Sequence, residues 1–279
     1  IMERQSTLAR EVAYSGIGLH SGREVKVRFL PAPADTGILF ERIDLPGRPR
    51  VPAQAACVTQ TMRATTLEAG DAKVFTVEHI LAAFSAMDID NCLIEIDSLE
   101  PPVADGSALP FLELLAEAGR CEQEALRSVY CIKETLIVRE EKRFISILPY
   151  DGFRITFTSV NPHKAIGIQF ADVEITKELF WREIAPARTI GFVHEIEALQ
   201  AQGLALGGSM ENAAVYDENG AVNVLRFADE LVRHKVLDVV GDLALAGPIK
   251  GHVVAVSSGH ALNTKLSQLI AAARQGGCA

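Results

Sequence analysis

The chain has 279 residues, which suits one large domain or two domains of roughly 100–150 residues each. Hydrophobic residues make up 48% and charged residues 23%, a balance typical of a folded globular protein, so a disordered chain is excluded. The formal net charge is −9 and the sequence pI is about 5.3, which argues against nucleic acid as the main partner, because phosphate binding requires a basic face.

The cysteines are scattered, odd in number and without a C-x-x-C pair: Cys57, Cys92, Cys121, Cys131 and Cys278. We therefore expect neither a disulfide framework nor a cysteine zinc site, and the pattern favours a reducing compartment. No uninterrupted apolar run reaches the roughly 18 residues that a transmembrane helix needs. The first residues also lack the apolar core of a signal peptide. We expect a cytoplasmic protein with no transmembrane segment.

The first half of the chain opens with alternating apolar and polar residues, which predict strands on both sides of the glycine-rich turn Gly16–Gly22. A helix should follow with Thr76 as its N-cap, because an apolar stripe at helical spacing comes directly after this residue. The elements expected here are strands at 6–14, 24–30 and 91–96, and helices at 76–86 and near 109–117.

The second half repeats this plan after a charged, less regular stretch at 121–126, where we place a domain boundary. Its expected strands are at 129–139, 143–148, 153–159 and 251–257, and its expected helices are at about 227–243 and 262–273. Irregular chain is expected after the strand at 153–159. The shared order, strands and then a helix, predicts an α+β fold with two similar domains, 1–125 and 126–279.

Residues 195–224 interrupt the second half and have the character of an insertion. A short helix is expected at 195–202, ending at Gly203, and Asn219-Gly220 marks a turn. A surface β-α-β excursion explains this segment about as well as a functional role does. Its small and apolar residues make it a candidate lining for an acyl chain.

The long helix at 227–243 carries His234, Asp238 and Asp242 on one stripe, at positions i, i+4 and i+8. Residues four apart share a helix face, so His234 and Asp238 can ligate one metal ion with nitrogen and oxygen atoms that suit zinc. Asp242 lies one turn further on, where it can orient another group. Taken alone, a His-x-x-x-Asp pair is more often a solvated face than a metal site.

Glu78 and His79 form a second candidate pair, in the first turn of an otherwise apolar helix. First-turn capping by Glu78 and a satisfied core position for His79 would explain them without function. A catalytic zinc, however, needs three protein ligands and a nearby carboxylate that takes a proton from water. His79 would complete the ligand set with the pair on the long helix, and Glu78 would be the base.

His260 and Thr189 are the remaining candidates. His260 follows a strand and opens a helix, and Asp242 could hold it protonated, because a nearby carboxylate raises the pKa of a histidine. A hydrogen-bonded turn histidine is the default alternative. Thr189 ends an extended, proline-punctuated segment and could donate to a developing oxyanion, although an ordinary edge threonine fits the pattern better.

Taken together, the motifs are far more specific than any one of them, and they extend from Gln5 to about Ala272. In chain order they are Gly18-Leu19-His20-Ser21-Gly22, Thr76-Val77-Glu78-His79, Asp105-Gly106-Ser107-Ala108, Ala185-Pro186-Ala187-Arg188-Thr189, Leu206-Gly207-Gly208-Ser209, Arg233-His234-Lys235-Val236-Leu237-Asp238, Gly241-Asp242-Leu243 and Ser258-Gly259-His260-Ala261-Leu262-Asn263. In this order and content, the chain resembles the zinc-dependent UDP-3-O-acyl-N-acetylglucosamine deacetylases of lipid A biosynthesis.

The resemblance implies a fold in which two similar α+β domains pack as a β-α-α-β sandwich with one insert per domain, and an active site at their junction. It implies Zn²⁺ as cofactor, held by His79, His234 and Asp238. It also implies catalytic roles for Glu78 as general base, His260 as general acid, Asp242 as the partner of that histidine and Thr189 as the oxyanion-side hydroxyl.

On the substrate side, the resemblance implies that the insert at 195–224 forms a hydrophobic passage for the fatty acyl chain. The residues implied near the substrate are Lys235, Phe192, Met62 and, as a phosphate contact, Arg143. The chain departs from the family pattern at Val160-Asn161-Pro162-His163, where an aromatic residue followed by Asn-His-Pro is common, and at Ser257, where many members have a basic residue. Both regions serve the nucleotide end of the substrate in the family.

The implied activity is hydrolysis of the N-acetyl group of UDP-3-O-(3-hydroxyacyl)-N-acetylglucosamine, giving acetate and a free 2-amino sugar nucleotide. One alternative is a zinc amidohydrolase acting on another N-acyl amino sugar, and a second is a non-catalytic metal-dependent binding protein. The expected partner is the acylated UDP-amino sugar, and we expect a monomer.

Overall fold

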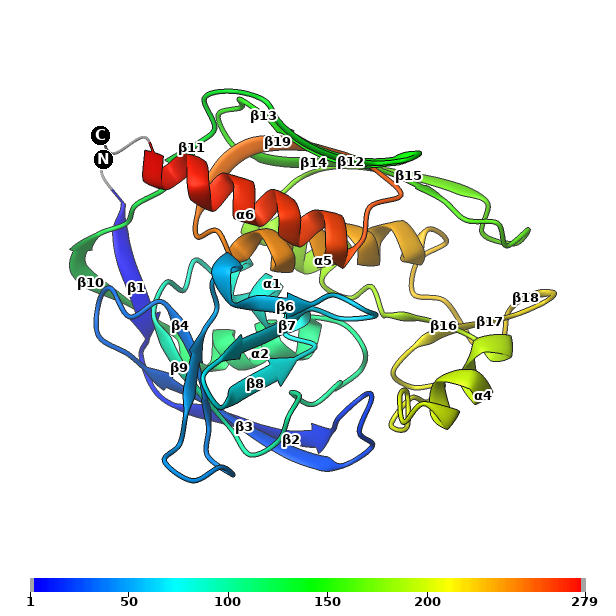
Figure 1. Ribbon diagram of the computed structural model, residues 1–279, viewed down its shortest axis with the longest axis horizontal. Helices are drawn as coiled ribbons and strands as arrows, with labels where there is room; N and C mark the ends of the chain where they lie inside the picture. The colour runs from blue at the N-terminus through cyan, green and yellow to red at the C-terminus, as the bar shows by residue number, and fades with distance from the viewer. Residues whose placement is uncertain (1–2, 277–279) are drawn as a thin grey trace.

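The computed structural model describes residues 3–276. Figure 1 shows two sheets on the outside of the molecule with the main helices packed between them. Each sheet buries one face: Val27 and Phe29 are fully buried in the first, and Ile155 and Phe157 in the second. Burying an apolar side chain of this size contributes about 1.5–3 kcal/mol, so the two inner faces and the helices between them form the core.

The N-terminal half is built on a five-stranded sheet in the order β2-β3-β9-β4-β5. Its strands are β2 (Val12–Ile17), β3 (Glu24–Pro31), β9 (Cys92–Ile96), β4 (Ile38–Arg42) and β5 (Arg50–Pro52). The central strand β9 runs antiparallel to β3 and parallel to β4. Its helices are α1 (Glu78–Ala86) and α2 (Leu109–Ala118).

The C-terminal half repeats this topology in the order β12-β13-β19-β14-β15. Its strands are β12 (Leu136–Glu140), β13 (Arg143–Leu148), β19 (Ile249–Val256), β14 (Phe153–Val160) and β15 (Ile168–Glu174), with β11 (Tyr130–Cys131) beside the start of β19. Strand β19 is antiparallel to β13 and parallel to β14, as β9 is to β3 and β4. The main helices are α5 (Glu230–Ala244) and α6 (His260–Gly276). The matching topology confirms the predicted α+β fold with two similar halves.

Each half also carries an insert. The N-terminal insert is a three-stranded sheet of β6 (Val58–Gln60), β7 (Thr66–Ala69) and β8 (Ala72–Phe75), preceded by the 3-10 turn Ala55–Cys57. The C-terminal insert consists of β16 (Ile190–Phe192), α4 (Val193–Ala201), β17 (Ala214–Asp217) and β18 (Gly220–Ala221). Just before it lie α3 (Lys177–Leu179) and a π-helical turn, Phe180–Ile184. Figure 1 shows both inserts reaching toward the same side of the molecule.

The two halves meet where α1 packs against α5, and Gly241 makes this close approach possible. A Cβ atom at Gly241 would lie 2.0 Å from the backbone oxygen of Glu78, so no larger residue fits without moving one helix. The contact brings the first turn of α1 against α5. These are the two helices that carry most of the predicted site residues.

Several local predictions were wrong. Residues 121–126 are not irregular: they belong to β10 (Arg120–Leu126), whose charged side chains face solvent while its backbone pairs with β1 (Arg4–Leu8). The strand predicted at 6–14 is two strands, β1 and β2, because the chain turns between them. The chain after β14 is not irregular throughout, since it includes β15. The boundary between 125 and 126 stays a prediction; β10 ends at Leu126 and β11 begins at Tyr130.

Thr76 is not the N-cap of α1. The capping position is Val77, which has no side chain that can cap, and the helix begins at Glu78. Thr76 instead has a φ of 57°, which is rare for a β-branched residue, and its buried hydroxyl has no hydrogen-bond partner. Its backbone turns the chain from β8 into α1 rather than capping the helix.

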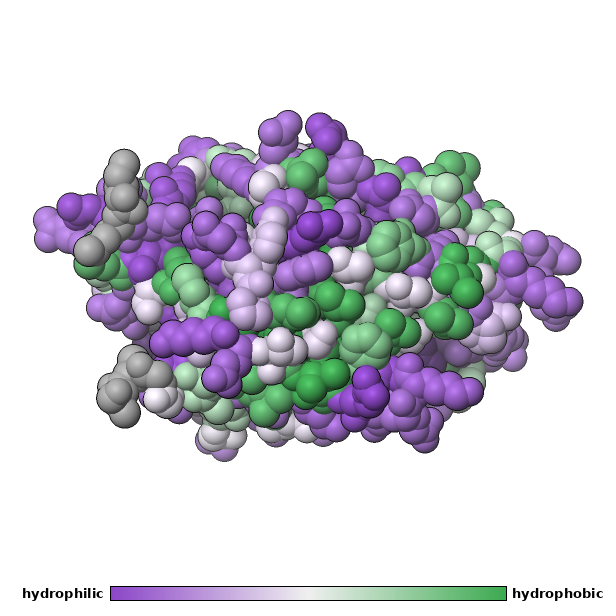
Figure 2. Space-filling model, turned by 90° about the horizontal axis from the view of Figure 1, so that it is seen from above, coloured by the Kyte–Doolittle hydropathy of each residue, from purple (hydrophilic) through white to green (hydrophobic). Residues whose placement is uncertain are grey.

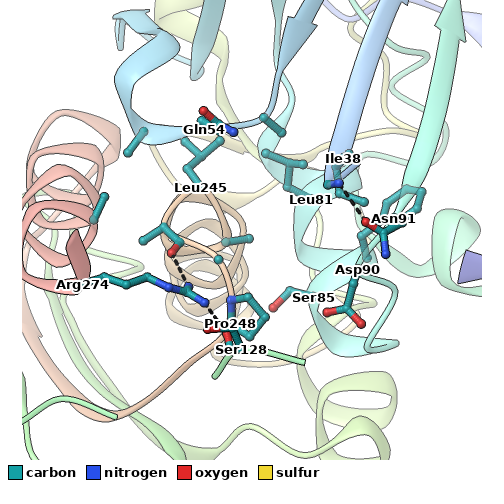
Figure 3. A pocket seen from close by; sticks show the side chains of 18 of the residues that line it. Ile38, Gln54, Leu81, Ser85, Asp90, Asn91, Ser128, Leu245, Pro248 and Arg274 are labelled. Atoms are coloured by element: carbon teal, nitrogen blue, oxygen red, sulfur yellow. Dashed lines mark hydrogen bonds between the residues drawn. The ribbon is translucent and has the colours of Figure 1, made fainter. Parts of the chain in front are cut away.

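Two surface features lie outside the predicted site. A cavity of about 480 Å³ is lined by residues of both halves, among them Leu81 of α1 and Arg274 of α6 (Figure 3). There Arg274 donates to the carbonyl oxygens of Ala246 and Ser128. None of the predicted site residues lines it. Seen from above, the side of the molecule on which the six-stranded sheet lies shows apolar residues among polar ones (Figure 2). Ile168 and Phe170 of its edge strand β15 are 73% and 60% exposed.

Among the described residues, no helix combines the length and apolar character needed to cross a bilayer.

Candidate metal centre and active site

His79, His234 and Asp238 converge at the α1–α5 contact. One nitrogen or oxygen atom from each lies within 4.8 Å of the other two. His234 Nε2 is 3.4 Å and His79 Nε2 is 4.0 Å from Asp238 Oδ1, and the two imidazole rings are 5.0 Å apart between centroids. As their spacing on α5 predicted, His234 and Asp238 lie together on one face of the helix. Helix α1 supplies the third side chain, His79, from the other half of the molecule.

The chemistry of these side chains fits a divalent metal ion. Asp238 Oδ1 is buried and has no hydrogen-bond partner, a costly state for a carboxylate oxygen unless something binds it. The backbone oxygen of Ala187 accepts a hydrogen bond of 3.0 Å from His234 Nδ1, which leaves Nε2 with a free lone pair. Burial and the neighbouring His234 lower the pKa of His79 to about 3, so its imidazole is neutral and able to ligate.

Lys235 compensates the charge of this buried carboxylate. Its Nζ donates to Asp238 Oδ2 at 2.9 Å. Burial opposes ionisation of Asp238, but Lys235 and His234 outweigh burial and lower the pKa of the carboxyl below its usual range. Asp238 is therefore ionised at neutral pH, with one oxygen satisfied by Lys235 and the other free.

Glu78 and His260 face each other beside the triad. His260 is the first residue of α6, and its Nε2 lies 3.8 Å from Glu78 Oε1. Glu78 is 2% exposed, and its other oxygen accepts from the backbone N–H of Thr65 at 3.1 Å. Burial, helped by the charges of Asp242 and Asp238, raises the pKa of Glu78 to about 7, while His260 opposes this shift. A carboxyl with a pKa near neutrality can exchange protons at physiological pH.

Asp242 organises this pair from the next turn of α5. Its Oδ2 accepts from His260 Nδ1 and from the side chain of Asn263, both at 2.9 Å, and its Oδ1 accepts from the Thr65 hydroxyl at 2.6 Å. Burial by itself lowers the pKa of His260, but Asp242 and Glu78 outweigh it and raise this pKa to about 10. His260 is therefore a cation at neutral pH, with one N–H bound to Asp242 and the other directed toward Glu78.

The segment from Ala185 to Thr189 passes alongside the triad and is fixed at both ends. The backbone of Thr189 donates to the oxygen of Gly106 at 2.8 Å, and Ala185 accepts from the N–H of Ala108 at 3.0 Å. Between them, the backbone and the guanidinium of Arg188 bind Glu230, the first residue of α5, at 3.0 and 2.9 Å. These hydrogen bonds fix the backbone of Ala187, whose carbonyl oxygen binds His234, and Thr189 follows two residues later.

The family model described as UDP-3-O-acyl N-acetylglycosamine deacetylase matches residues 5–272. The chain belongs to this family. Curated relatives that carry the name UDP-3-O-acyl-N-acetylglucosamine deacetylase agree with the assignment. That of Syntrophotalea carbinolica is 45% identical over 271 residues, covering 96% of this chain and 88% of its own. That of Oleidesulfovibrio alaskensis is 47% identical over 262 residues, covering 93% and 86%. That of Psychrobacter arcticus is 45% identical over 267 residues, covering 94% and 83%.

Membership of the deacetylase family confirms the resemblance drawn from the motifs, and the structure explains the positions of several of them. Gly241 allows the α1–α5 contact, and Gly106 has a φ of 84° with the backbone oxygen of Asn212 only 1.9 Å from where a Cβ would lie. These glycines bring elements of the two halves close together at the junction. The individual roles of the site residues remain predictions.

The predicted substrate residues of this deacetylase-family chain are more dispersed than the triad. Phe192 ends β16 in the C-terminal insert, where its ring lies 5.8 Å from that of His163. Met62 is 77% exposed on the loop between β6 and β7. Arg143 begins β13, and its guanidinium donates to Glu140 at 2.6 Å on the surface. Among these four described residues, Lys235 is the one that hydrogen-bonds to a member of the triad.

The two departures from the family pattern touch each other. The hydroxyl oxygen of Ser257 accepts from the backbone N–H of Val160 at 3.1 Å. His163 Nε2 is 2.6 Å from the backbone oxygen of Asp217, which ties the β14–β15 turn to the C-terminal insert. The sequence changes at 160–163 and 257 therefore lie together, at one end of the six-stranded sheet.

Sequence reasoning missed Thr65, which binds both Glu78 and Asp242, and gave no role to Asn263, Ala187 or Glu230. Thr65 lies on an irregular loop, and only the fold brings it to the site. The carbonyl of Ala187 carries no side-chain signal at all. Glu230 stands in the first turn of the long helix, where acidic residues are common, so nothing in the pattern marked it as buried.

Proposed function

We propose that this chain hydrolyses the N-acetyl group of UDP-3-O-(3-hydroxyacyl)-N-acetylglucosamine, releasing acetate and the free 2-amino sugar nucleotide, the committed step of lipid A biosynthesis. The carrying observation is the buried Asp238 Oδ1, which has no hydrogen-bond partner and lies between two imidazoles, directly beside a carboxyl–imidazole pair suited to proton transfer. We infer the substrate from the names of the relatives, and the geometry of the site supports the type of reaction.

His79, His234 and Asp238 would hold Zn²⁺, since two imidazole nitrogens and one carboxylate oxygen are a donor set that catalytic zinc sites use. Bound there, the ion would act as a Lewis acid that polarises the amide carbonyl and makes water a stronger nucleophile at neutral pH. Ala187 orients one ligand through His234 Nδ1, and Lys235 balances the charge of another.

The proton transfers fall to Glu78 and His260. Glu78 takes a proton from the water as its oxygen attacks the acetyl carbon, which a carboxyl with a pKa of about 7 can do at neutral pH. The hydroxyl of Thr189 donates to the carbonyl oxygen as negative charge develops on it. His260, held protonated by Asp242, gives its proton to the amide nitrogen as the C–N bond breaks. The products are acetate and the amine.

The ends of the substrate have separate candidate contacts. The C-terminal insert, with Phe192, and the exposed Met62 are suited to the acyl chain, and Arg143 is the proposed phosphate contact. We also propose a cytoplasmic location, because Cys57, Cys92, Cys121 and Cys131 are free thiols, as in a reducing compartment. A monomer is the expected state, which light scattering of the purified protein would test.

The deciding experiment is acetate release from the UDP-linked substrate by the purified protein, by the chelator-treated protein and after Zn²⁺ is added back. We expect activity to be lost with the metal and restored by zinc. Activity that survives complete metal removal would refute the metal-dependent reaction. A substrate without the 3-O-acyl chain tests the specificity, since equal kcat/KM for both substrates would indicate a different N-acyl amino sugar.

Glu78→Gln provides the matched variant for this experiment. It preserves the size of the side chain but removes the proton acceptor, so acetate release should fall by about 10²–10⁴. Zinc content by elemental analysis should stay at the wild-type level, because Glu78 is not among the ligating residues. Wild-type turnover in this variant would exclude Glu78 as the base.

A further inference from the structure

Helix α4 covers the C-terminal insert but is weakly anchored within it. None of its residues, Val193–Ala201, is buried. A helix of this length without a buried face is not stable on its own, because helices in proteins draw most of their stability from packing. The insert also contacts the N-terminal half at two places near α4.

The first such contact is made by backbone hydrogen bonds and is partly buried. The glycine-rich turn between β2 and β3 accepts backbone hydrogen bonds from the insert loop, from Leu206 to His20 at 3.2 Å and from Gly207 to Leu19 at 2.9 Å. The N–H of Ala205 donates to His20 Nδ1 at 3.3 Å, and burial lowers the pKa of His20, which keeps it neutral and able to accept. A Cβ atom at Gly207 would lie 2.2 Å from the backbone oxygen of Gly18, so the fit is tight. Figure 1 shows this turn beside the loop that follows α4.

The second contact is a single exposed ion pair. Arg63, on the loop between β6 and β7, donates to Glu195 in the first turn of α4 at 3.1 Å, and the two side chains are 48% and 33% exposed. Exposed pairs of this kind add little to global stability and open readily. Arg63 also has a φ of 65°, an uncommon conformation for a non-glycine residue.

A cavity of about 760 Å³ lies beside these two contacts. Its apolar lining includes Met62, next to Arg63, together with Leu204 and Leu206 of the insert loop and Phe75 and Leu99 of the N-terminal half. His20, which takes part in the first contact, lines it as well. Opening the ion pair while the turn stays bound would free α4 from the β6–β7 loop and widen access beside Met62.

We propose that Arg63 and Glu195 form a latch that holds α4 against the β6–β7 loop and so determines how tightly a long 3-O-acyl chain is retained. This inference rests on the proposed function, because it needs an acyl chain at the insert. The latch residues are positioning residues: they act on the substrate through α4 and touch none of the reacting atoms.

The test uses Arg63→Gln, Glu195→Gln and the charge swap R63E/E195R, with Glu197→Gln on the same helix as the control. Steady-state kinetics are measured with the long-chain substrate and with the analogue that lacks the 3-O-acyl group. Each single variant should raise KM for the long-chain substrate about 2- to 5-fold, the range expected for one exposed pair, with kcat unchanged. The analogue should be unaffected, the swap should restore KM, and Glu197→Gln should match the wild type.

Amide hydrogen exchange supplies a readout that does not depend on activity. Exchange in residues 193–203 should be about 2- to 5-fold faster in both single variants and near the wild-type rate in the swap. Unchanged exchange there would refute the latch even in a fully active enzyme. A rise in KM in Arg63→Gln alone would also overturn it, since that pattern indicates that Arg63 binds substrate phosphate directly. If the wild type releases no acetate, the proposed function fails, while the exchange result still decides whether the ion pair fastens α4.

Discussion

Asp242 accepts hydrogen bonds from His260, Asn263 and Thr65, and its carboxylate is the largest of the charges that raise the pKa of His260. A general acid must be protonated, so activity on the alkaline side should fall as pH rises through the pKa of His260. Asp242→Asn removes the charge with little change in shape. The pKa of His260 should then drop, and the alkaline limb of the kcat/KM profile should move to lower pH.

The control for this prediction is Asp151→Asn, a change at an exposed carboxylate that pairs with Lys250 on the surface. Its pH profile should coincide with that of the wild type. An alkaline limb at the same pH in Asp242→Asn and the wild type would mean that another group controls it. The direction of the shift separates an electrostatic role for Asp242 from a merely structural one, which would lower activity equally at all pH values.

At the scale of elements, the crossing of α1 and α5 determines whether the site exists. Gly241→Ala places a methyl group about where the backbone oxygen of Glu78 lies, 2.0 Å from the ideal Cβ position. In an isolated helix, alanine would be about 1 kcal/mol better than glycine. Here the helices must separate, and we expect a net loss of about 1–3 kcal/mol in unfolding free energy, as in other overpacked cores.

Denaturant unfolding measures this loss, with Gly276→Ala at the end of α6 as the control, because a methyl group there meets no atom within 4 Å. Acetate release should fall in Gly241→Ala by more than its stability explains, since the shift displaces Glu78 and His79 together. Full stability and activity in this variant would show that the helices do not depend on their close approach.

The elements that could be predicted are those with a strong period. The apolar stripe of α5 and the alternation in β3 predicted these elements to within a few residues, because β3 buries one face and α5 is long and packs its apolar residues into the core. Strands β6, β7 and β10 were not predicted, because they are short or charged. Backbone pairing holds them in place, and it leaves little trace in the pattern of side chains. The fold class and the helix of the C-terminal insert could therefore be predicted, but the three-stranded N-terminal insert could not.

The candidate site divides in the same way. His234, Asp238 and Asp242 share a helix face, so spacing alone grouped them. His79 and His260 come from other elements, and no spacing rule could bring them to α5; the sequence offered only their chemistry and the family pattern. Thr65 and the carbonyl of Ala187 depend on loop conformation, which carries no periodic signal. The grouping of side chains on one helix could be predicted from the sequence. The meeting of side chains from the two halves could be seen only in the fold.

At the scale of the whole molecule, the candidate metal site joins the two halves. His79 comes from the N-terminal half and His234 and Asp238 from the C-terminal half, so an ion held by all three cross-links them. A ligand that binds only the folded protein stabilises it by about 4 kcal/mol at a concentration of 1,000 times its Kd. For a chain of this size we therefore expect chelation to lower Tm by on the order of 10 °C.

Calorimetry with and without Zn²⁺ measures this difference, and Asp238→Asn shows whether the ion acts through the bridge. The amide cannot supply a carboxylate oxygen, so the zinc-dependent rise in Tm should shrink, whereas Asp151→Asn should retain it in full. Binding within one half would leave the rise intact when His79 is replaced by Gln. We expect His79→Gln to reduce the rise as strongly as Asp238→Asn does, because a bridge between the halves fails when either side is removed.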